Sequence, residues 1–237
     1  ELSGSTAHRW IKCPGSVRLC RGVPKTSSAA ASQGTMAHAL AEAILTDAYS
    51  RENSDSFTYM DGGEKKTERV TDDMLNHVMV YVNRVRELEK KHKATAHVEY
   101  KVDLRRLVRD HMWGVADVVL DYHKDVVYNG PIVYEQTVLH VIDFKYGFSP
   151  VRLIDDDGYI NSQLLYYAAG ALDKFNWIHK HVIIEIVQPR CVEVESIQSH
   201  EMTAECVKGW VENVLTPAAR ATDGAGAPLI TGDHCRF

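Results

Sequence analysis

The spacing of hydrophobic residues changes along this chain, and each spacing predicts one type of secondary structure. Apolar residues recur at helical intervals over residues 35–49, 71–91 and 159–172, which predicts three helices with one buried face each. Short runs rich in β-branched residues predict strands between and after them. The predicted strands cover residues 96–102, 113–120, 138–142 and 182–187, and a last amphipathic helix covers residues 203–219.

Polar stretches separate these elements and are predicted to be irregular. Residues 51–69 contain Gly62-Gly63 and a run of charges, which is typical of a mobile surface loop. Residues 122–136 are predicted to be the long polar loop of a hairpin. An irregular N-terminal segment is expected over residues 1–33, and a Gly/Ala/Pro-rich tail over residues 220–237.

The order of the elements predicts the fold class. Helix, three strands, helix and strand follow one another in an αβββαβ order, so we expect an α/β (α+β) protein with a mixed central sheet flanked by helices. The chain has 237 residues, no internal repeat and no stretch that resembles a linker. A single domain over residues 1–237 is therefore expected.

Acidic residues and a lysine stand at or near the ends of two predicted strands. Alternate side chains of a strand share a face, so Asp143 and Lys145 should project together. Asp117 lies within an apolar run, where an aspartate is disfavoured unless it is paired. Two carboxylates beside an ammonium suit metal-assisted phosphodiester hydrolysis, because the acids can hold a cation and the lysine can orient water and offset developing charge. The alternative is a set of ordinary solvated strand ends.

Three further positions extend this candidate site. Glu99, in the preceding strand, is either a third acid or an exposed strand residue. Gln163 and Tyr167 are four residues apart and share one helix face, so they either shape the site or form part of a packed stripe. His38 lies in the first predicted helix, where a histidine is more often capped or buried than a ligand.

Taken in order, these residues resemble the PD-(D/E)XK nuclease superfamily, specifically its RecB-like branch and the phage- and prophage-encoded members related to the nucleases of CRISPR adaptation. The resemblance spans nearly the whole chain and rests on five short motifs. They are an N-terminal cysteine segment at 9–16, Gly-Thr-x-x-His at 34–38, Gly-x-x-Asp at 114–117, Asp-x-Lys at 143–145 and Gln-x-x-x-Tyr at 163–167.

The resemblance implies a restriction-endonuclease-like fold and a role for each matching residue. It implies that Asp117, Asp143 and His38 bind Mg²⁺ or Mn²⁺, cations that suit hard ligands and phosphate substrates. Lys145 would assist at the attacked phosphate, and Gln163 and Tyr167 would contact DNA. The implied function is a metal-dependent DNA exonuclease in phage recombination or DNA processing, with DNA and a recombination protein as partners.

Two other functions compete with this one. A catalytically silent module that binds DNA ends or a partner protein would use the same fold, but it has no reason to keep Asp117, Asp143 and Lys145 together. A small-molecule phosphohydrolase would be expected to carry a glycine-rich phosphate-binding loop, and this sequence has none.

The cysteines raise the question of an iron–sulfur cluster. Many relatives of the implied family bind a four-iron cluster through one N-terminal cysteine and three near the C-terminus. Cys13 and Cys235 match two of these positions. A cluster normally needs four thiolates, so we expect none in the sequence as given unless Cys20, Cys191 or Cys206 substitute.

Charge and composition narrow the function classes. A net charge of −5 argues against a protein that coats nucleic acid non-specifically, because such binding depends on many phosphate contacts. It leaves a nuclease open, since bound cations neutralise an acidic centre. Five cysteines without a disulfide pattern, no secretory segment and no apolar run near about 20 residues predict a protein of the bacterial cytoplasm that does not enter membranes.

Overall fold

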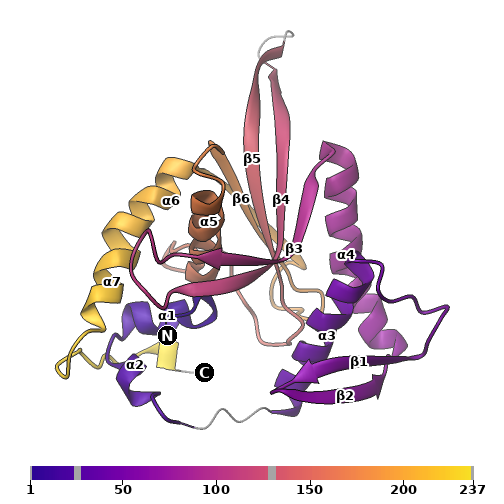
Figure 1. Ribbon diagram of the computed structural model, residues 1–237, viewed down its shortest axis with the longest axis horizontal. Helices are drawn as coiled ribbons and strands as arrows, with labels where there is room; N and C mark the ends of the chain where they lie inside the picture. Colours follow the sequence, from indigo (N-terminus) through magenta and orange to yellow (C-terminus); the bar gives the residue numbers. More distant parts are fainter. Residues whose placement is uncertain (1, 24–27, 128–131, 236–237) are drawn as a thin grey trace.

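The computed structural model describes residues 2–23, 28–127 and 132–235 and contains one five-stranded sheet and one separate hairpin (Figure 1). The strands are β1 (Ser56–Asp61), β2 (Glu64–Arg69), β3 (Thr95–Asp103), β4 (Trp113–Val127), β5 (Ile132–Phe144), β6 (His181–Val187) and β7 (Ile197–Thr203). The helices are α1 (Ala7–Lys12), α2 (Ser16–Leu19), α3 (Ala29–Leu45), α4 (Asp72–His92), α5 (Ser162–Lys174), α6 (Ala204–Trp210) and α7 (Thr216–Ala221). A π-helical turn joins α6 to α7 at Val211–Leu215, and short 3₁₀ turns occupy Gly4–Thr6 and Asp233–Cys235.

The central sheet is mixed, with strand order β3-β4-β5-β6-β7. Among the described strands, β5 and β6 are the parallel pair, and α5 connects them, as a crossover between parallel strands requires. All other neighbours are antiparallel. The predicted order of helix, three strands, helix and strand corresponds to α4, β3 to β5, α5 and β6, so the predicted fold class is confirmed.

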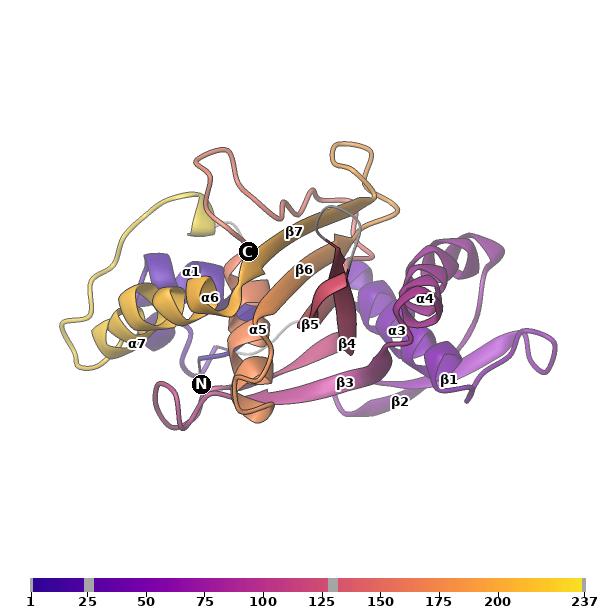
Figure 2. The same ribbon diagram turned by 90° about the horizontal axis from the view of Figure 1, so that it is seen from above.

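Helices cover both faces of the sheet and bury a separate core on each (Figures 1 and 2). One core lies between the sheet and α5, with α1 and α6 packed against that helix and α7 packed against α1. The other lies between the sheet and the pair α3 and α4. Consecutive β5 residues alternate between the two, since Leu139 and Val141 belong to the first core and Val138 and Ile142 to the second.

The predicted loop over residues 51–69 is wrong, because most of this segment forms the β1–β2 hairpin. Gly62 and Gly63 make its turn with positive φ angles of 59° and 91°. Two glycines between short alternating runs are a hairpin signal. Tyr59 is buried while the charged β2 side chains are mostly exposed, so the high charge of the segment masked its strand character.

The predicted hairpin loop over residues 122–136 is also wrong. β4 continues to Val127 and β5 begins at Ile132, and these extensions pair with each other beyond the covering helices (Figure 1). Their polar residues follow from that position, because a two-stranded ribbon outside the helix layers has little apolar surface to bury.

The N-terminal region is more ordered than predicted, and one strand near the C-terminus was missed. Residues 1–33, expected to be irregular, contain α1, α2 and the start of α3, which begins at Ala29 instead of residue 35. The edge strand β7 was missed because most of its side chains are polar and at least partly exposed. The last predicted helix is confirmed as α6, the π turn and α7. Among the described helices, none is both long and apolar enough to cross a membrane.

Candidate active site

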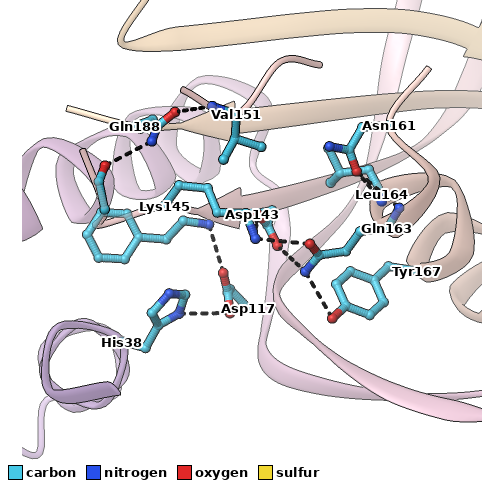
Figure 3. Close-up of polar contacts among 12 residues, drawn as sticks. His38, Asp117, Asp143, Lys145, Val151, Asn161, Gln163, Leu164, Tyr167 and Gln188 are labelled. Atoms are coloured by element: carbon cyan, nitrogen blue, oxygen red, sulfur yellow. Dashed lines mark hydrogen bonds and ion pairs between the residues drawn. The ribbon is translucent and has the colours of Figure 1, made fainter. Parts of the chain in front are cut away.

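The two predicted aspartates meet where β4 and β5 come together. The ladder between these strands pairs Val118 with Ile142, so Asp117 and Asp143 occupy the next position on each strand. Asp117 Oδ2 accepts a hydrogen bond of 2.7 Å from the backbone N–H of Phe144. One carboxylate is therefore fixed to the neighbouring strand, and the two acids lie side by side (Figure 3).

Lys145 and Gln163 hold the second carboxylate. Lys145 Nζ lies 2.9 Å from Asp143 Oδ2, and Gln163 Nε2 donates to Asp143 Oδ1 at 3.0 Å. The same glutamine accepts a 3.0 Å hydrogen bond from Lys145 and donates one of 3.2 Å to the Tyr167 hydroxyl. The predicted neighbours Asp143 and Lys145, and Gln163 and Tyr167, thus form one connected network (Figure 3).

His38 approaches the acids from α3, on the side opposite Gln163 (Figure 3). Its Nδ1 lies 3.1 Å from Asp117 Oδ1, and its ring contacts Phe144 at a centroid distance of 5.3 Å. The imidazole is about one-third exposed, with 34% of its side-chain surface accessible. The site therefore joins both helix layers at the inner strands β4 and β5.

Glu99 stands beside Asp117 at a break in the β3–β4 ladder. The ladder pairs Val98 with Val118 and Tyr100 with Ala116, but the intervening Glu99 and Asp117 form no bridge. Glu99 has a positive φ of 49°, which is rare for a residue with a side chain. The alternation of side chains along β3 and β4 reverses at this break. Alternate residues that pack into one core before the break pack into the other core after it. Glu99 and Asp117 lie at this reversal and therefore do not follow the alternation of either strand.

Burial and mutual repulsion make the acids electrostatically unequal. Burial, followed by repulsion from Asp117, raises the pKa of Asp143 despite the opposing effect of Lys145. Burial also acts to raise the pKa of Asp117, but the attraction and hydrogen bond of His38, the N–H of Phe144 and the charge of Lys145 together outweigh it and lower that pKa. Burial and the charge of Asp117 raise the pKa of Glu99 to about 7. The site therefore holds more carboxylate groups than it has positively charged groups to neutralise them.

The lysine remains a cation in this environment. Burial alone would lower the pKa of Lys145, but attraction and hydrogen bonding to Asp143 overcome it and raise the pKa above its usual value. The ammonium can therefore donate hydrogen bonds to an anion at neutral pH. It has no tendency to lose its proton and act as a general base.

The donor set suits a divalent cation with oxygen ligands, although the side chains are engaged with one another. Asp117 and Asp143 provide carboxylate oxygens, His38 an imidazole nitrogen, and Glu99 a further carboxylate nearby. Among the described residues, no three or more His, Cys, Asp or Glu side chains already form a group that could hold a metal ion. Lys145 and Gln163 occupy the oxygens of Asp143, so cation binding here would require these partners to shift.

Two glycines shape the wall of the site around Tyr167. A Cβ atom at Gly114 would lie 2.9 Å from Tyr167 Cε1, and one at Gly4 would lie 2.7 Å from the same atom. Gly114 therefore allows the tyrosine ring to pass close to β4. Gly34 is different, because a Cβ there would meet no atom within 4 Å.

Sequence reasoning missed two residues next to the site. Tyr81 of α4 stacks on Phe144 at 4.8 Å, and its buried hydroxyl has no hydrogen-bond partner among the described residues. Burial and the charges of Asp117 and Asp143 raise its pKa well above the usual value. Its helical spacing indicated only a core position, and no sequence signal marked the hydroxyl.

Gln188 is the second missed residue and fixes the loop that follows Lys145. It is fully buried, accepts from the N–H of Val151 at 2.9 Å, and donates to the carbonyls of Gly147 and Ser149 (Figure 3). It follows the apolar strand β6, so only its polar identity after an apolar run could have marked it.

Cys13 and Cys235 approach the same segment near the C-terminus. Cys13 is buried and its sulfur accepts a hydrogen bond from the N–H of Ile230, whereas exposed Cys235 points its sulfur at the Ile230 carbonyl, 3.8 Å away. Neither takes part in a group of three or more potential metal ligands within the described ranges.

Comparisons with known proteins show a family without an assigned activity. A crystal structure from Eubacterium rectale, named "Putative exonuclease", matches 99% of this chain and 86% of its own chain, with 12% sequence identity and a TM-score of 0.45. The family model described as "Protein of unknown function (DUF2800)" matches residues 1–237, so the chain belongs to the DUF2800 family.

Proposed function

We propose that this protein is a divalent-metal-dependent deoxyribonuclease that hydrolyses phosphodiester bonds from DNA ends. The observation that carries the proposal is the convergence of Asp117, Asp143 and Lys145 from two paired strands. Buried carboxylates next to a protonated lysine suit a reaction in which negative charge grows on a phosphate. The motifs that resemble RecB-like nucleases supply the substrate class and the preference for ends.

The chain's own residues would bind and polarise the phosphate. Lys145 would donate hydrogen bonds to a non-bridging oxygen as the water oxygen bonds to phosphorus and the bond to the leaving oxygen breaks. Because its pKa is raised, Lys145 would stabilise charge and keep its own proton. The proton of the attacking water would pass to solvent, and solvent would protonate the leaving oxygen. Gln163 would hold the Lys145 ammonium and the Asp143 carboxylate in position relative to each other, because it is hydrogen-bonded to both.

A metal ion would complete this site. Asp117 and Asp143 would hold Mg²⁺ or Mn²⁺, with His38 as a further ligand and Glu99 close by. When bound, such a cation supplies Lewis-acid stabilisation and lowers the pKa of water. The raised pKa of Asp143 supports the proposal, because a buried carboxylate near a second one gains from an added positive charge.

End-labelled linear DNA and covalently closed circular DNA test the proposed function. We expect linear DNA to be shortened from an end with Mg²⁺ or Mn²⁺, circles to persist, and EDTA to stop the reaction. Rapid linearisation of the circles would indicate an endonuclease. If neither substrate is cut with any divalent metal, the silent binding module is the better account.

A further inference from the structure

A cavity lies next to the acidic site and shares Tyr167 with its hydrogen-bond network. Its volume is about 540 Å³, within the range of roughly 300–1,000 Å³ typical of ligand pockets. The N-terminal segment, α1 and α2 form one side, and the start of β4 forms the other. Its lining includes Arg9, Arg21, Ser16, Trp113 and Tyr167.

The cavity carries positive charge in a protein that is acidic overall. Described residues 2–23 contain four Lys or Arg residues and no Asp or Glu, although the whole chain has a net charge of −5. Within the described residues, the guanidinium groups of Arg9 and Arg21 form no ion pair with a carboxylate. Two guanidinium groups in one pocket, without a carboxylate partner in the described part of the chain, favour an anion, and phosphate matches their geometry well.

The charges of this segment and of Lys145 both act on His8 of α1. His8 of α1 has a lowered pKa because of burial, with smaller effects from the charges of Arg9, Lys12 and Lys145. The N-terminal cations and Lys145 therefore act on a common region. An anionic chain bound at Lys145 would experience the potential of the cavity as well.

Two uncharged side chains give the cavity further binding groups. Ser16 is 8% exposed, and its buried hydroxyl has no hydrogen-bond partner within the described residues. A buried hydroxyl without a partner is costly, and a bound anion can satisfy it. Trp113 is 51% exposed, so its ring is available for stacking on a base.

Tyr167 connects the cavity to the acidic site. Its ring forms part of the cavity lining, and its hydroxyl accepts from Gln163, which also donates to Asp143. One residue thus separates the cavity from the carboxylates. A strand whose phosphate reaches Lys145 would place a neighbouring nucleotide at this wall.

We infer that the cavity binds the terminal nucleotide of a DNA strand, with Arg9 and Arg21 on a terminal phosphate and Trp113 stacked on the base. This inference rests on the proposed function, since it assigns the cavity to the same substrate. It also provides a physical basis for dependence on ends, because a terminal phosphate carries more charge than an internal one.

Binding in EDTA tests the inference independently of cleavage. The affinity of the full chain is measured by anisotropy for an internally labelled single-stranded oligonucleotide with a 5′-phosphate, a 3′-phosphate or neither. We expect one phosphorylated form to bind about tenfold more tightly than the unphosphorylated one, which corresponds to roughly one additional charge-assisted contact. Arg9→Gln combined with Arg21→Gln should remove the preference.

Arg18→Gln is the matched control, because Arg18 belongs to the same segment but does not line the cavity. The Arg18→Gln variant should retain the preference for the phosphorylated form. Trp113→Ala should weaken the binding of all three oligonucleotides to the same extent. Equal binding of the three forms to the wild type, or an unchanged preference in the Arg9/Arg21 variant, would overturn the inference. So would displacement of the oligonucleotide by an equimolar mononucleotide, which would indicate a site for free nucleotides.

The outcome separates this inference from the proposed function. A phosphate preference that depends on Arg9 and Arg21 supports the cavity assignment even if no DNA is cleaved. Cleavage without any such preference would leave the nuclease proposal standing and remove the terminal-nucleotide site. Thermal unfolding of each variant checks that a lost preference does not reflect a lost fold.

Discussion

Two groups of charged side chains are buried in the central sheet, and their charges are balanced differently. In the first, Arg84 of α4 donates two hydrogen bonds of 2.9 Å to Glu185 of β6, and His140 Nε2 lies 3.5 Å from the same carboxylate. In the second, Asp117, Asp143 and Glu99 lie close to Lys145 and His38. The first group has one carboxylate for its guanidinium, whereas the second has an additional acid.

The pKa values reflect this difference in balance. Burial acts to raise the pKa of Glu185, but the combined hydrogen bonding and charge of Arg84 and His140 lower it to about 2. Asp143 also has a cationic partner, yet burial and Asp117 raise its pKa. A matched pair leaves no buried charge uncompensated, whereas an excess of acid is what a cation-binding site requires. Burial of a charged residue is therefore not enough to identify a functional site.

The largest expected effect is on catalysis at the acidic site. Asp143→Asn should abolish DNA cleavage, because the amide keeps the shape of the side chain but removes the charge that would hold a cation. Its thermal unfolding temperature should be no lower than that of the wild type, since repulsion with Asp117 is relieved. Full activity in the folded variant would rule out this role for Asp143.

The next largest effect is expected for Lys145→Ala. This substitution should lower turnover by a factor of about 10²–10³, the usual effect of removing one charge-stabilising donor. Binding of DNA in EDTA should change much less than turnover. Lys124→Ala, at an exposed position of β4 outside the site, is the control for loss of one positive charge. If the lysine variant lost DNA affinity but kept its cleavage rate, Lys145 would be a phosphate anchor only.

At the matched pair, the expected effect is on stability. Arg84→Leu should cost about 3–5 kcal/mol of unfolding free energy in urea, because it leaves the Glu185 carboxylate buried without its partner. Arg84→Leu combined with Glu185→Leu should recover most of that loss. A single variant as stable as the wild type would show that the pair does not hold α4 on the sheet.

A smaller stability effect is expected at Gly114. Alanine there would place its Cβ against Tyr167 and should cost about 1–3 kcal/mol, the usual range for overpacking. Gly34→Ala is the control in α3, where no atom lies within 4 Å of the new Cβ, and should stabilise by about 0.5–1 kcal/mol. Equal effects of the two substitutions in urea unfolding would contradict the close approach of Tyr167 to β4.

The smallest expected effect is on the pH dependence of stability, and its sign differs between the groups. The folded-state pKa of Glu185 is lowered from 4.5 to about 2, so its contribution is complete above pH 4.5 and is lost as the pH falls toward 2. The pKa of Asp143 is raised above 3.8, so its protonation favours the folded state on acidification. On acidification from neutral pH to about pH 4, the Asp143→Asn variant should therefore lose more stability than the wild type. Urea midpoints that fall in parallel with pH for the two proteins would contradict this.

Local sequence patterns predicted those parts of the site whose residues lie close together in the chain. Strand alternation placed Asp143 beside Lys145, and helical spacing placed Gln163 beside Tyr167. The contact of His38 with Asp117 spans 79 residues, and no local pattern fixes it. For that pair, only the resemblance to known nucleases suggested a shared role.

Other features depend on packing that no local signal encodes. The positive φ of Glu99 and the change of faces at Asp117 arise where β3 and β4 separate two cores. The pair Arg84 and Glu185 joins a helix and a strand 101 residues apart. In contrast, the β1–β2 hairpin did have a local signal in its two glycines, and its high charge concealed it.

The central claim is that the acidic site, unlike the Arg84–Glu185 pair, has carboxylate charge available for a cation. Calorimetric titration of the full chain with Mn²⁺ tests this claim most directly, without DNA. The account predicts saturable binding to the wild type and to Arg84→Leu combined with Glu185→Leu, and loss of that binding in Asp143→Asn. Equal binding by the wild type and Asp143→Asn, or no binding by the wild type, would contradict it.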